Sequence, residues 1–143
     1  MTGVSARAHA TFHLCLPATP LSARAARRTA RGFAVRAGIT GRRLDEIELA
    51  VAESCANAVV HGLPDGSGTF DVTGYLSGDT MTVCTTDPGA GIGGSLGPGG
   101  LGLGLPLIAA LSDELRFEVP DAGGTQVRMT FLVPTAVRPP ARQ

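Results

Sequence analysis

The chain has 143 residues, enough for one domain with a buried core, and 43% hydrophobic residues beside 17% charged residues exclude an intrinsically disordered chain. The formal net charge is zero, but every acidic residue lies at or after Asp45 while eight arginines precede it, so the start is basic and the remainder acidic. The sequence has no lysine, which excludes any mechanism that needs a phosphate-binding lysine.

The cysteines and the apolar runs indicate the kind of cellular compartment in which the protein is expected. Cys15, Cys55 and Cys84 lie far apart in apolar contexts, which predicts small buried hydrophobic residues in a reducing compartment rather than a disulfide framework or a zinc site. No apolar run approaches the roughly 20 residues that span a bilayer, so no membrane partner is expected. Because aromatic residues make up only 4% of the chain, we expect a core of Ala, Val, Leu and Ile.

A leader, a strand and a helix are expected at the start of the chain. Residues 1–9 are expected to be flexible, and Ala10 to Leu16 alternates apolar and polar positions, which predicts a strand. Thr19 and Pro20 supply an N-cap and a proline at the first helical position, so a helix is expected from there to about Ala37.

This first helix is expected to end at Gly38. The residues expected to face the core lie at intervals of four: Leu21, Ala25, Thr29 and Phe33. Its arginines fit a solvated face, and the alternative is a surface for an acidic partner.

The second helix carries the most informative stretch. An alanine- and valine-rich run from Ile47 to Val60 predicts a buried helix that stops at Gly62. Glu53, Asn57 and His61 are four residues apart and therefore project from one face as a polar stripe. Burying a carboxylate and an amide is costly unless each finds a partner, so the stripe indicates a site. A general base beside an oxygen ligand for Mg²⁺ fits the pair, and the alternative is a core amide with a salt-bridged Glu53.

The second half of the chain predicts hairpins around a third helix. A turn at residues 77–79 joins two strands, an irregular Gly- and Pro-rich loop covers Ile92 to Gly100, and the helix begins near Gly102 or Gly104 so that Pro106 falls in its first turn. A turn at residues 120–124 joins the closing strands, and a disordered Pro- and Arg-rich tail is expected over residues 134–143. The expected elements are strands at Thr69–Leu76, Thr80–Thr86, Leu115–Val119 and Thr125–Val133 and a helix that continues to Leu111.

This order of elements predicts one α+β domain over residues 10–133. Hairpins outnumber βαβ units in the second half, so the sheet is expected to be mixed, mostly antiparallel, with about three helices on one face as a two-layer sandwich.

Three segments are candidates for a common site: the pair Glu53 and Asn57, the turn from Asp87 to Gly91, and the glycine cluster from Gly100 to Gly104. A carboxylate at a strand end can accept a hydrogen bond from the exocyclic amine of adenine, and glycines after it let a flat base approach the backbone. Free amides at a helix N-terminus form an anion site that suits phosphates. Each segment alone is also explained by an ordinary turn or a flexible loop.

In this combination the motifs resemble the Bergerat-fold, or GHKL, ATP-binding superfamily, and within it the RsbW-type group of anti-sigma factors and serine-protein kinases. Glu-x-x-x-Asn-Ala-x-x-His at residues 53–61 resembles the N-box of that family. Asp87-x-Gly-x-Gly resembles its first glycine box, Gly102-Leu-Gly its second, and Gly124-Thr its last. The resemblance covers roughly residues 10–133 and implies the Bergerat ATP-binding fold, also called histidine-kinase-like.

The resemblance implies a role for each matched residue. Glu53 is implied as the catalytic base that activates a serine hydroxyl of a partner, and Asn57 as the ligand of an Mg²⁺ ion that bridges the ATP phosphates. His61 receives no chemical role. The other implied nucleotide-binding residues are Asp87 on the adenine amine, Gly89, Gly91 beside the base, Gly102 and Gly104 under the phosphates, and Thr125 near the adenine.

The family implies a function in transcription regulation. Members of this kind are cytoplasmic ATP-dependent protein serine/threonine kinases, a class of transferases, that bind a sigma factor or phosphorylate a STAS-type anti-anti-sigma protein. They are often homodimers, and no direct contact with nucleic acid is expected.

One departure from the family pattern supports a second reading. Family members usually have a longer lid with charged residues between the first two glycine boxes, whereas residues 92–100 are few and uncharged. Phosphoryl transfer relies on neutralising charge on the transferred group. The alternative is therefore a non-catalytic regulatory binding module of the same fold with weak or no nucleotide turnover.

Two other readings have little support. Gly89-x-Gly91-x-x-Gly94 resembles a dinucleotide fingerprint, but that motif needs a helix at its last glycine and residues 95–98 cannot supply one. DNA binding through the arginine-rich helix lacks any groove-reading motif.

Overall fold

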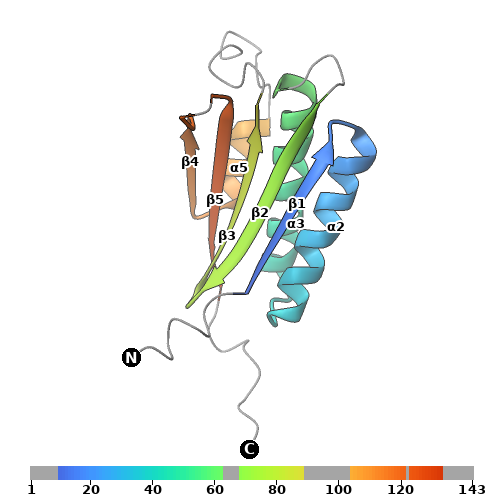
Figure 1. Ribbon diagram of the computed structural model, residues 1–143. Helices are drawn as coiled ribbons and strands as arrows, with labels where there is room; N and C mark the ends of the chain where they lie inside the picture. The colour runs from blue at the N-terminus through green and yellow to red at the C-terminus, as the bar shows by residue number, and fades with distance from the viewer. Residues whose placement is uncertain (1–9, 63–67, 89–103, 122, 134–143) are drawn as a thin grey trace, which may run out of the picture.

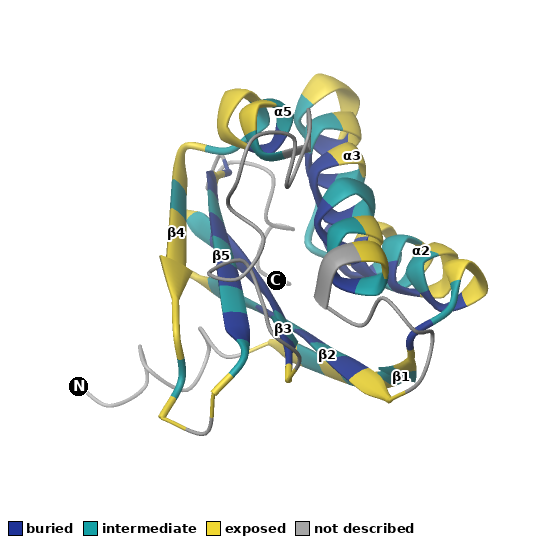
Figure 2. Ribbon diagram, turned by 90° about the horizontal axis from the view of Figure 1, so that it is seen from above, coloured by how far each residue is buried: buried dark blue, intermediate teal, exposed yellow. Residues whose placement is uncertain are grey.

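The protein is a two-layer structure in which helices cover one face of a single sheet (Figures 1 and 2). The computed structural model describes residues 10–62, 68–88, 104–121 and 123–133. The predicted α+β sandwich is confirmed. The expected leader, the lid and the tail all lie outside the described residues.

The sheet contains five strands in the spatial order β1-β2-β3-β5-β4. Every neighbouring pair is antiparallel, so the sheet that was expected to be mixed is antiparallel throughout its described strands. Strands β3 and β5 are neighbours although α5 and β4 separate them in the chain, which brings the end of β3 beside the start of β5. The strands are β1 (Thr11–Pro17), β2 (Thr69–Ser77), β3 (Thr80–Asp87), β4 (Glu114–Glu118) and β5 (Thr125–Leu132).

The helical layer is formed by α2 (Pro20–Arg36), α3 (Gly41–Asn57) and α5 (Gly104–Leu111), and a π-helical turn, η1 (Ala58–Gly62), extends α3. Thr19 caps α2 as predicted, because its hydroxyl oxygen accepts a hydrogen bond from the Ser22 amide at 3.1 Å. Gly38 follows α2 with φ +91°, a conformation that favours glycine, and so ends the helix where expected.

The predicted inward face of α2 is confirmed at Phe33 but wrong at its first two positions. Leu21 is 71% exposed and Ala25 is exposed, whereas the buried positions are Ser22, Ala26, Ala30, Phe33 and Ala34. A strict four-residue spacing drifts around a helix of 3.6 residues per turn, so three such steps do not keep one direction. Spacings of three and four together follow the observed face, and its alanines let α2 approach α3 closely.

Three ion-pair contacts cross from α2 to α3. Arg31 lies 2.8 Å from a carboxylate oxygen of Glu48 and 3.9 Å from one of Asp45, and Arg27 lies 3.5 Å from the other Glu48 oxygen. These pairs are partly solvent-exposed, so each contributes at most about 1 kcal/mol to stability. Four other arginines on this layer, Arg24, Arg28, Arg36 and Arg42, are exposed and form no ion pair with any described residue.

The core lies between the sheet and the helices and is less aliphatic than composition suggested. Phe70 and Phe131 are its largest fully buried side chains, and Met81 and Met129 lie beside them. Few aromatic residues occur in the chain, but most of the phenylalanines are placed inside. Ile47 and Val51 of α3 complete the contact with the sheet.

Gly74 of β2 makes room for an aromatic pair. A Cβ at this position would lie 2.3 Å from the ring of Phe12. That ring packs edge to face on Phe33 of α2, with ring centroids 5.1 Å apart. The missing side chain therefore lets β1 and α2 close the open end of the core.

The three cysteines are free, as predicted, but only two are buried. Cys55 and Cys84 lie inside, and burial raises the pKa of the Cys55 thiol to about 12. Cys15 is exposed because alternation along β1 turns it to the sheet face without helices, which corrects the expected burial. No helix in the described ranges is long and apolar enough to cross a membrane.

Candidate functional site

Helix α3 places Glu53 and Asn57 beside the core rather than within it. The core-facing residues of α3 include Ile47, Val51 and Cys55, all fully buried. Glu53 and Asn57 are partly buried and lie one helical turn apart on the flank of that buried stripe. The predicted pairing of an acid with an amide on one helix face is therefore present.

The Glu53 carboxylate forms no hydrogen bond and no ion pair with any residue that the structure describes. The alternative of a salt-bridged structural glutamate is thus not supported among these residues. Other acids of α3 differ, since Glu46 and Glu48 both pair with arginines.

The Asn57 side chain is an unsatisfied amide. Its Nδ2 atom is buried and has no hydrogen-bond partner among the described residues. Leaving such a group unpaired costs about 1–3 kcal/mol, so the position indicates a role that a satisfied core amide would not have. Because the two ends of an amide are assigned from their contacts, the buried end can equally carry the oxygen that a hard cation needs.

Helix α3 changes its winding immediately after Asn57. Residues from Ala58 to Gly62 form a π-helical turn instead of the expected continuation of the α-helix. Such wide turns are rare and concentrate at functional sites. His61 falls in this turn, and its side chain lies outside what the structure describes.

A buried hydroxyl pair connects α3 to β3 next to these residues. Ser54 and Thr85 are both buried and hydrogen-bonded to each other. Thr85 lies two residues before Asp87, so both point to the helical side of the sheet. Our sequence interpretation missed this pair, and the only signal for it was a serine directly after Glu53 in an otherwise apolar run.

Asp87 and Thr125 form the end of the β3–β5 ladder. They lie directly opposite each other and are 7% and 3% exposed. Alternation places Asp87 on the same face as Thr85, that is, beneath α3. The predicted carboxylate at a strand end is therefore buried and directed to the helix that carries Glu53.

Gly124 brings two backbones into close contact at this end. A Cβ at position 124 would lie 2.0 Å from the Asp87 carbonyl oxygen and 2.9 Å from the Pro88 Cα atom. Its φ of +82° also favours glycine. The last predicted glycine box is thus required by the backbone geometry beside Asp87.

The elements that carry the candidate residues meet at one end of the molecule. In Figure 1 the end of α3, the end of β3 and the start of β5 all lie at the top of the view. Gly104 is the first residue of α5, which packs along α3. Gly89, Gly91 and Gly102 lie outside the described residues, so their predicted places stay predictions.

The described residues fit a nucleotide with its metal ion in two respects. Asn57 has a buried amide atom and Glu53 a partly buried carboxylate, and neither group has a polar partner among the described residues. No group of three or more metal-binding side chains occurs in the described part of the chain.

Comparisons with known proteins agree with this geometry. The model of the histidine kinase-like ATPase domain matches residues 16–131. The serine-protein kinase RsbW of Halalkalibacterium halodurans is 33% identical over 135 residues, which covers 84% of this chain and 82% of that protein. The anti-sigma F factor of Thermoanaerobacter sp. is 28% identical over 116 residues, covering 73% of this chain and 81% of its own.

Solved structures show the same architecture. The RsbU and RsbW domains of Rv1364c from Mycobacterium tuberculosis align with a TM-score of 0.69 and 29% identity, covering 93% of this chain but only 34% of that longer protein. A chain of the SiaB–SiaC complex from Pseudomonas aeruginosa aligns with a TM-score of 0.71 at 13% identity, which shows the fold alone. The chain therefore belongs to the histidine kinase-like ATPase domain family, among its RsbW-type anti-sigma factors and serine-protein kinases.

Proposed function

We propose that the protein binds Mg-ATP at this end of the sheet and phosphorylates a serine of a STAS-type anti-anti-sigma partner in the cytoplasm. The observation that carries the proposal is the pair Glu53 and Asn57, one turn apart and without polar partners among the described residues, on the helix that contacts β3 two residues before the buried Asp87. The names of the relatives, a serine-protein kinase and an anti-sigma factor, support the same class.

Binding is divided among these residues. Asp87 accepts a hydrogen bond from the adenine amine, Thr125 lies beside it, and Gly124 permits the close backbone approach that positions Asp87. Asn57 holds Mg²⁺ through its amide oxygen, and the first amides of α5, from Gly104, face the phosphates. The metal ion would neutralise phosphate charge during transfer.

Glu53 acts as the general base. It accepts the proton of the serine hydroxyl while that oxygen bonds to the γ-phosphorus, and the bond to the β-phosphate oxygen breaks to release ADP. A carboxylate already engaged in a salt bridge would be a poor acceptor, so its lack of a partner among the described residues suits this role.

The solvent face of α3 offers contact area for a protein substrate. Leu49 of α3 and Val60 of the π-helical turn that follows it are 42% and 58% exposed, and Leu49 lies one turn before Glu53 on the same side of the helix. A serine that reaches Glu53 brings its own neighbouring residues against these apolar side chains. This arrangement supports a protein substrate over a small molecule.

We further propose that the same protein, as a homodimer, sequesters a sigma factor through the helical layer. Arg24, Arg28, Arg36 and Arg42 lie on this layer without an ion-pair partner among the described residues and favour an acidic partner surface.

Incubation with Mg-ATP and a STAS-type partner tests the kinase proposal. We expect phosphoserine on the partner and a rate of phosphorylation at least about 100-fold lower in Glu53→Gln. The rate should be unchanged in Glu48→Gln, because the Glu48 carboxylate pairs with α2 instead. A normal rate in Glu53→Gln would refute the role of this residue as the base.

A second candidate, a binding module without catalysis, is favoured by the uncharged lid segment at residues 92–100. Calorimetric titration with Mg-ATP and Mg-ADP measures whether the chain binds nucleotide at all. Asp87→Asn is the control, and its affinity for both nucleotides should be about tenfold lower. Tight complex formation with the partner but no phosphoserine would support the module.

A further inference from the structure

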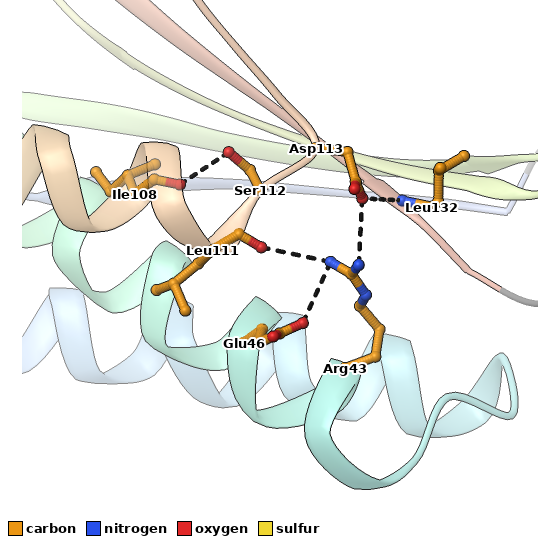
Figure 3. A network of polar contacts seen from close by, with 7 residues as sticks. All are labelled: Arg43, Glu46, Ile108, Leu111, Ser112, Asp113 and Leu132. Atoms are coloured by element: carbon orange, nitrogen blue, oxygen red, sulfur yellow. Dashed lines mark hydrogen bonds and ion pairs between the residues drawn. The ribbon is translucent and has the colours of Figure 1, made fainter.

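Arg43 joins two helices and the sheet at the end of α3 remote from the candidate site (Figure 3). Its Nη1 atom donates to the Leu111 carbonyl oxygen at 3.4 Å and lies 3.4 Å from a Glu46 carboxylate oxygen. Its Nη2 atom lies 3.3 Å from a carboxylate oxygen of Asp113. The guanidinium carbon also lies 5.9 Å from the ring centroid of Phe131 in β5.

Asp113 extends this network into the sheet. The same carboxylate oxygen accepts a hydrogen bond from the Leu132 amide at 2.7 Å, and the Asp113 amide donates to the Thr130 carbonyl at 2.8 Å. One residue earlier, the Ser112 hydroxyl closes the last turn of α5 by donating to the Ile108 carbonyl at 2.8 Å. The C-terminal end of α5 is therefore fixed both to α3 and to β5.

Apolar packing against α3 holds α5 along its length. It has eight residues, and Ile108 is its one fully buried side chain among those the structure describes, whereas Leu105, Leu107 and Leu111 are only partly buried. A helix this short is not stable by itself, so tertiary contacts decide where it lies. Arg43 donates to the Leu111 carbonyl at the C-terminal end of α5 and so places a cation where the helix dipole favours it.

The direction of α5 connects this network to the candidate site. The beginning of α3 contacts the end of α5, so the two helices run in opposite directions. The first residue of α5, Gly104, is therefore directed toward the half of α3 that carries Glu53 and Asn57. A short helix moves as one body, so release of its end at Leu111 also displaces its first amides.

We infer that Arg43 is a positioning residue for nucleotide binding: it holds α5 so that the N-terminal amides of this helix face the phosphates. The inference rests on the proposed function, because it assumes that ATP binds at this end. Arg43 itself lies 14 residues before Asn57, about 21 Å along the helix, and so touches no part of the nucleotide.

A purely structural role predicts something different. If Arg43 only stabilised the fold, its loss would lower the affinity for all ligands equally or for none of them. A positioning role acts on the phosphates alone, because adenine is bound through Asp87, Thr125 and Gly124 on the sheet, which α5 does not carry.

The test compares the affinities of the full chain for Mg-ATP and for adenosine, measured by calorimetry or NMR titration. In Arg43→Gln we expect the Kd for Mg-ATP to rise about fivefold and the Kd for adenosine to stay unchanged. Arg43→Lys retains the charge and should recover part of the affinity for Mg-ATP. The matched control is Arg116→Gln, which removes an arginine paired with Glu114 at 2.7 Å on β4 and leaves α5 untouched.

Equal weakening of both ligands, or no change in either, would overturn the inference. If Arg43→Gln does not fold, the same ratio is measured in Asp113→Asn, which keeps the hydrogen-bond acceptor but removes the charge beside Arg43. A wild-type chain that binds no Mg-ATP would instead refute the proposed function, so the two failures are distinguishable.

Discussion

The turn before β5 offers a test of the site geometry with its own control. Gly123 and Gly124 are neighbours, and both have positive φ, +94° and +82°. A Cβ on Gly123 would meet no atom within 4 Å, whereas a Cβ on Gly124 would lie 2.0 Å from the Asp87 carbonyl oxygen. Alanine at either position therefore imposes the same kind of backbone strain, and only Gly124→Ala adds a collision with another part of the backbone.

The two costs differ in origin and size. A left-handed conformation costs an L-residue about 1–2 kcal/mol, so Gly123→Ala should lower the free energy of unfolding by about 1.5 kcal/mol. Gly124→Ala must also push the ends of β3 and β5 apart by more than an ångström, which disrupts the Asp87–Thr125 pairing and adds about another 1.5 kcal/mol. In a domain of this size each kcal/mol lowers Tm by about 3 °C, so the expected decreases are about 5 °C and 9 °C.

Thermal unfolding followed by circular dichroism measures both variants, and adenosine titration measures the site. We expect Gly124→Ala to lose adenosine affinity because Asp87 and Thr125 move, while Gly123→Ala retains it. Equal Tm values for the two variants would show that the close approach of the two backbones is not a constraint, and the reasoning about the last glycine box would fail.

Three further outcomes are expected. Gly74→Ala should lower the free energy of unfolding by about 1–3 kcal/mol through its collision with Phe12. In urea unfolding, the double variant with Phe12→Leu should lose less stability than the sum of the two single losses, and strict additivity would contradict the packing argument. Gly32→Ala in α2 places its Cβ 3.5 Å from the Arg36 side chain, an ordinary contact, and should raise stability by about 0.5–1 kcal/mol; a lower Tm would contradict this. Burial raises the pKa of Cys55 in the folded state to about 12 from 9.0, so the thiol of the unfolded chain loses its proton first as the pH rises. The free energy of unfolding should therefore fall by about 1.4 kcal/mol per pH unit above about pH 9. Cys55→Ala should lack this part of the slope, and the same slope in the variant would show that the thiol is not buried.

Local chemistry determined much of the fold that sequence reasoning predicted. Thr19 and Gly38 delimit the first helix through a cap and a left-handed residue, and Gly78 marks the hairpin between β2 and β3. These signals depend only on neighbouring residues, so no tertiary information is needed. The polar pair on α3 was predicted for the same reason, since a helix fixes which residues share a face.

Properties that depend on packing were not accessible in the same way. The inward face of α2 depends on where α3 lies, and four-residue spacing chose Leu21, which is exposed, over Ala26, which is fully buried. Cys15 is apolar in context but lies on the outer face of β1. The Ser54–Thr85 pair and the contacts of Arg43 join residues far apart in the chain, and a single sequence contains no signal for such partners.

The register between β3 and β5 explains why the site residues themselves need not stabilise the fold. Val83 lies opposite Met129 and Asp87 opposite Thr125, so the core-facing and site-facing residues belong to one alternating series. A slip by one residue would turn Val127, Met129 and Phe131 toward the solvent face, at about 1.5–3 kcal/mol for each large side chain. The apolar residues therefore fix the position of Asp87, and Glu53 and Asn57 can remain without partners among the described residues above it, available to a ligand.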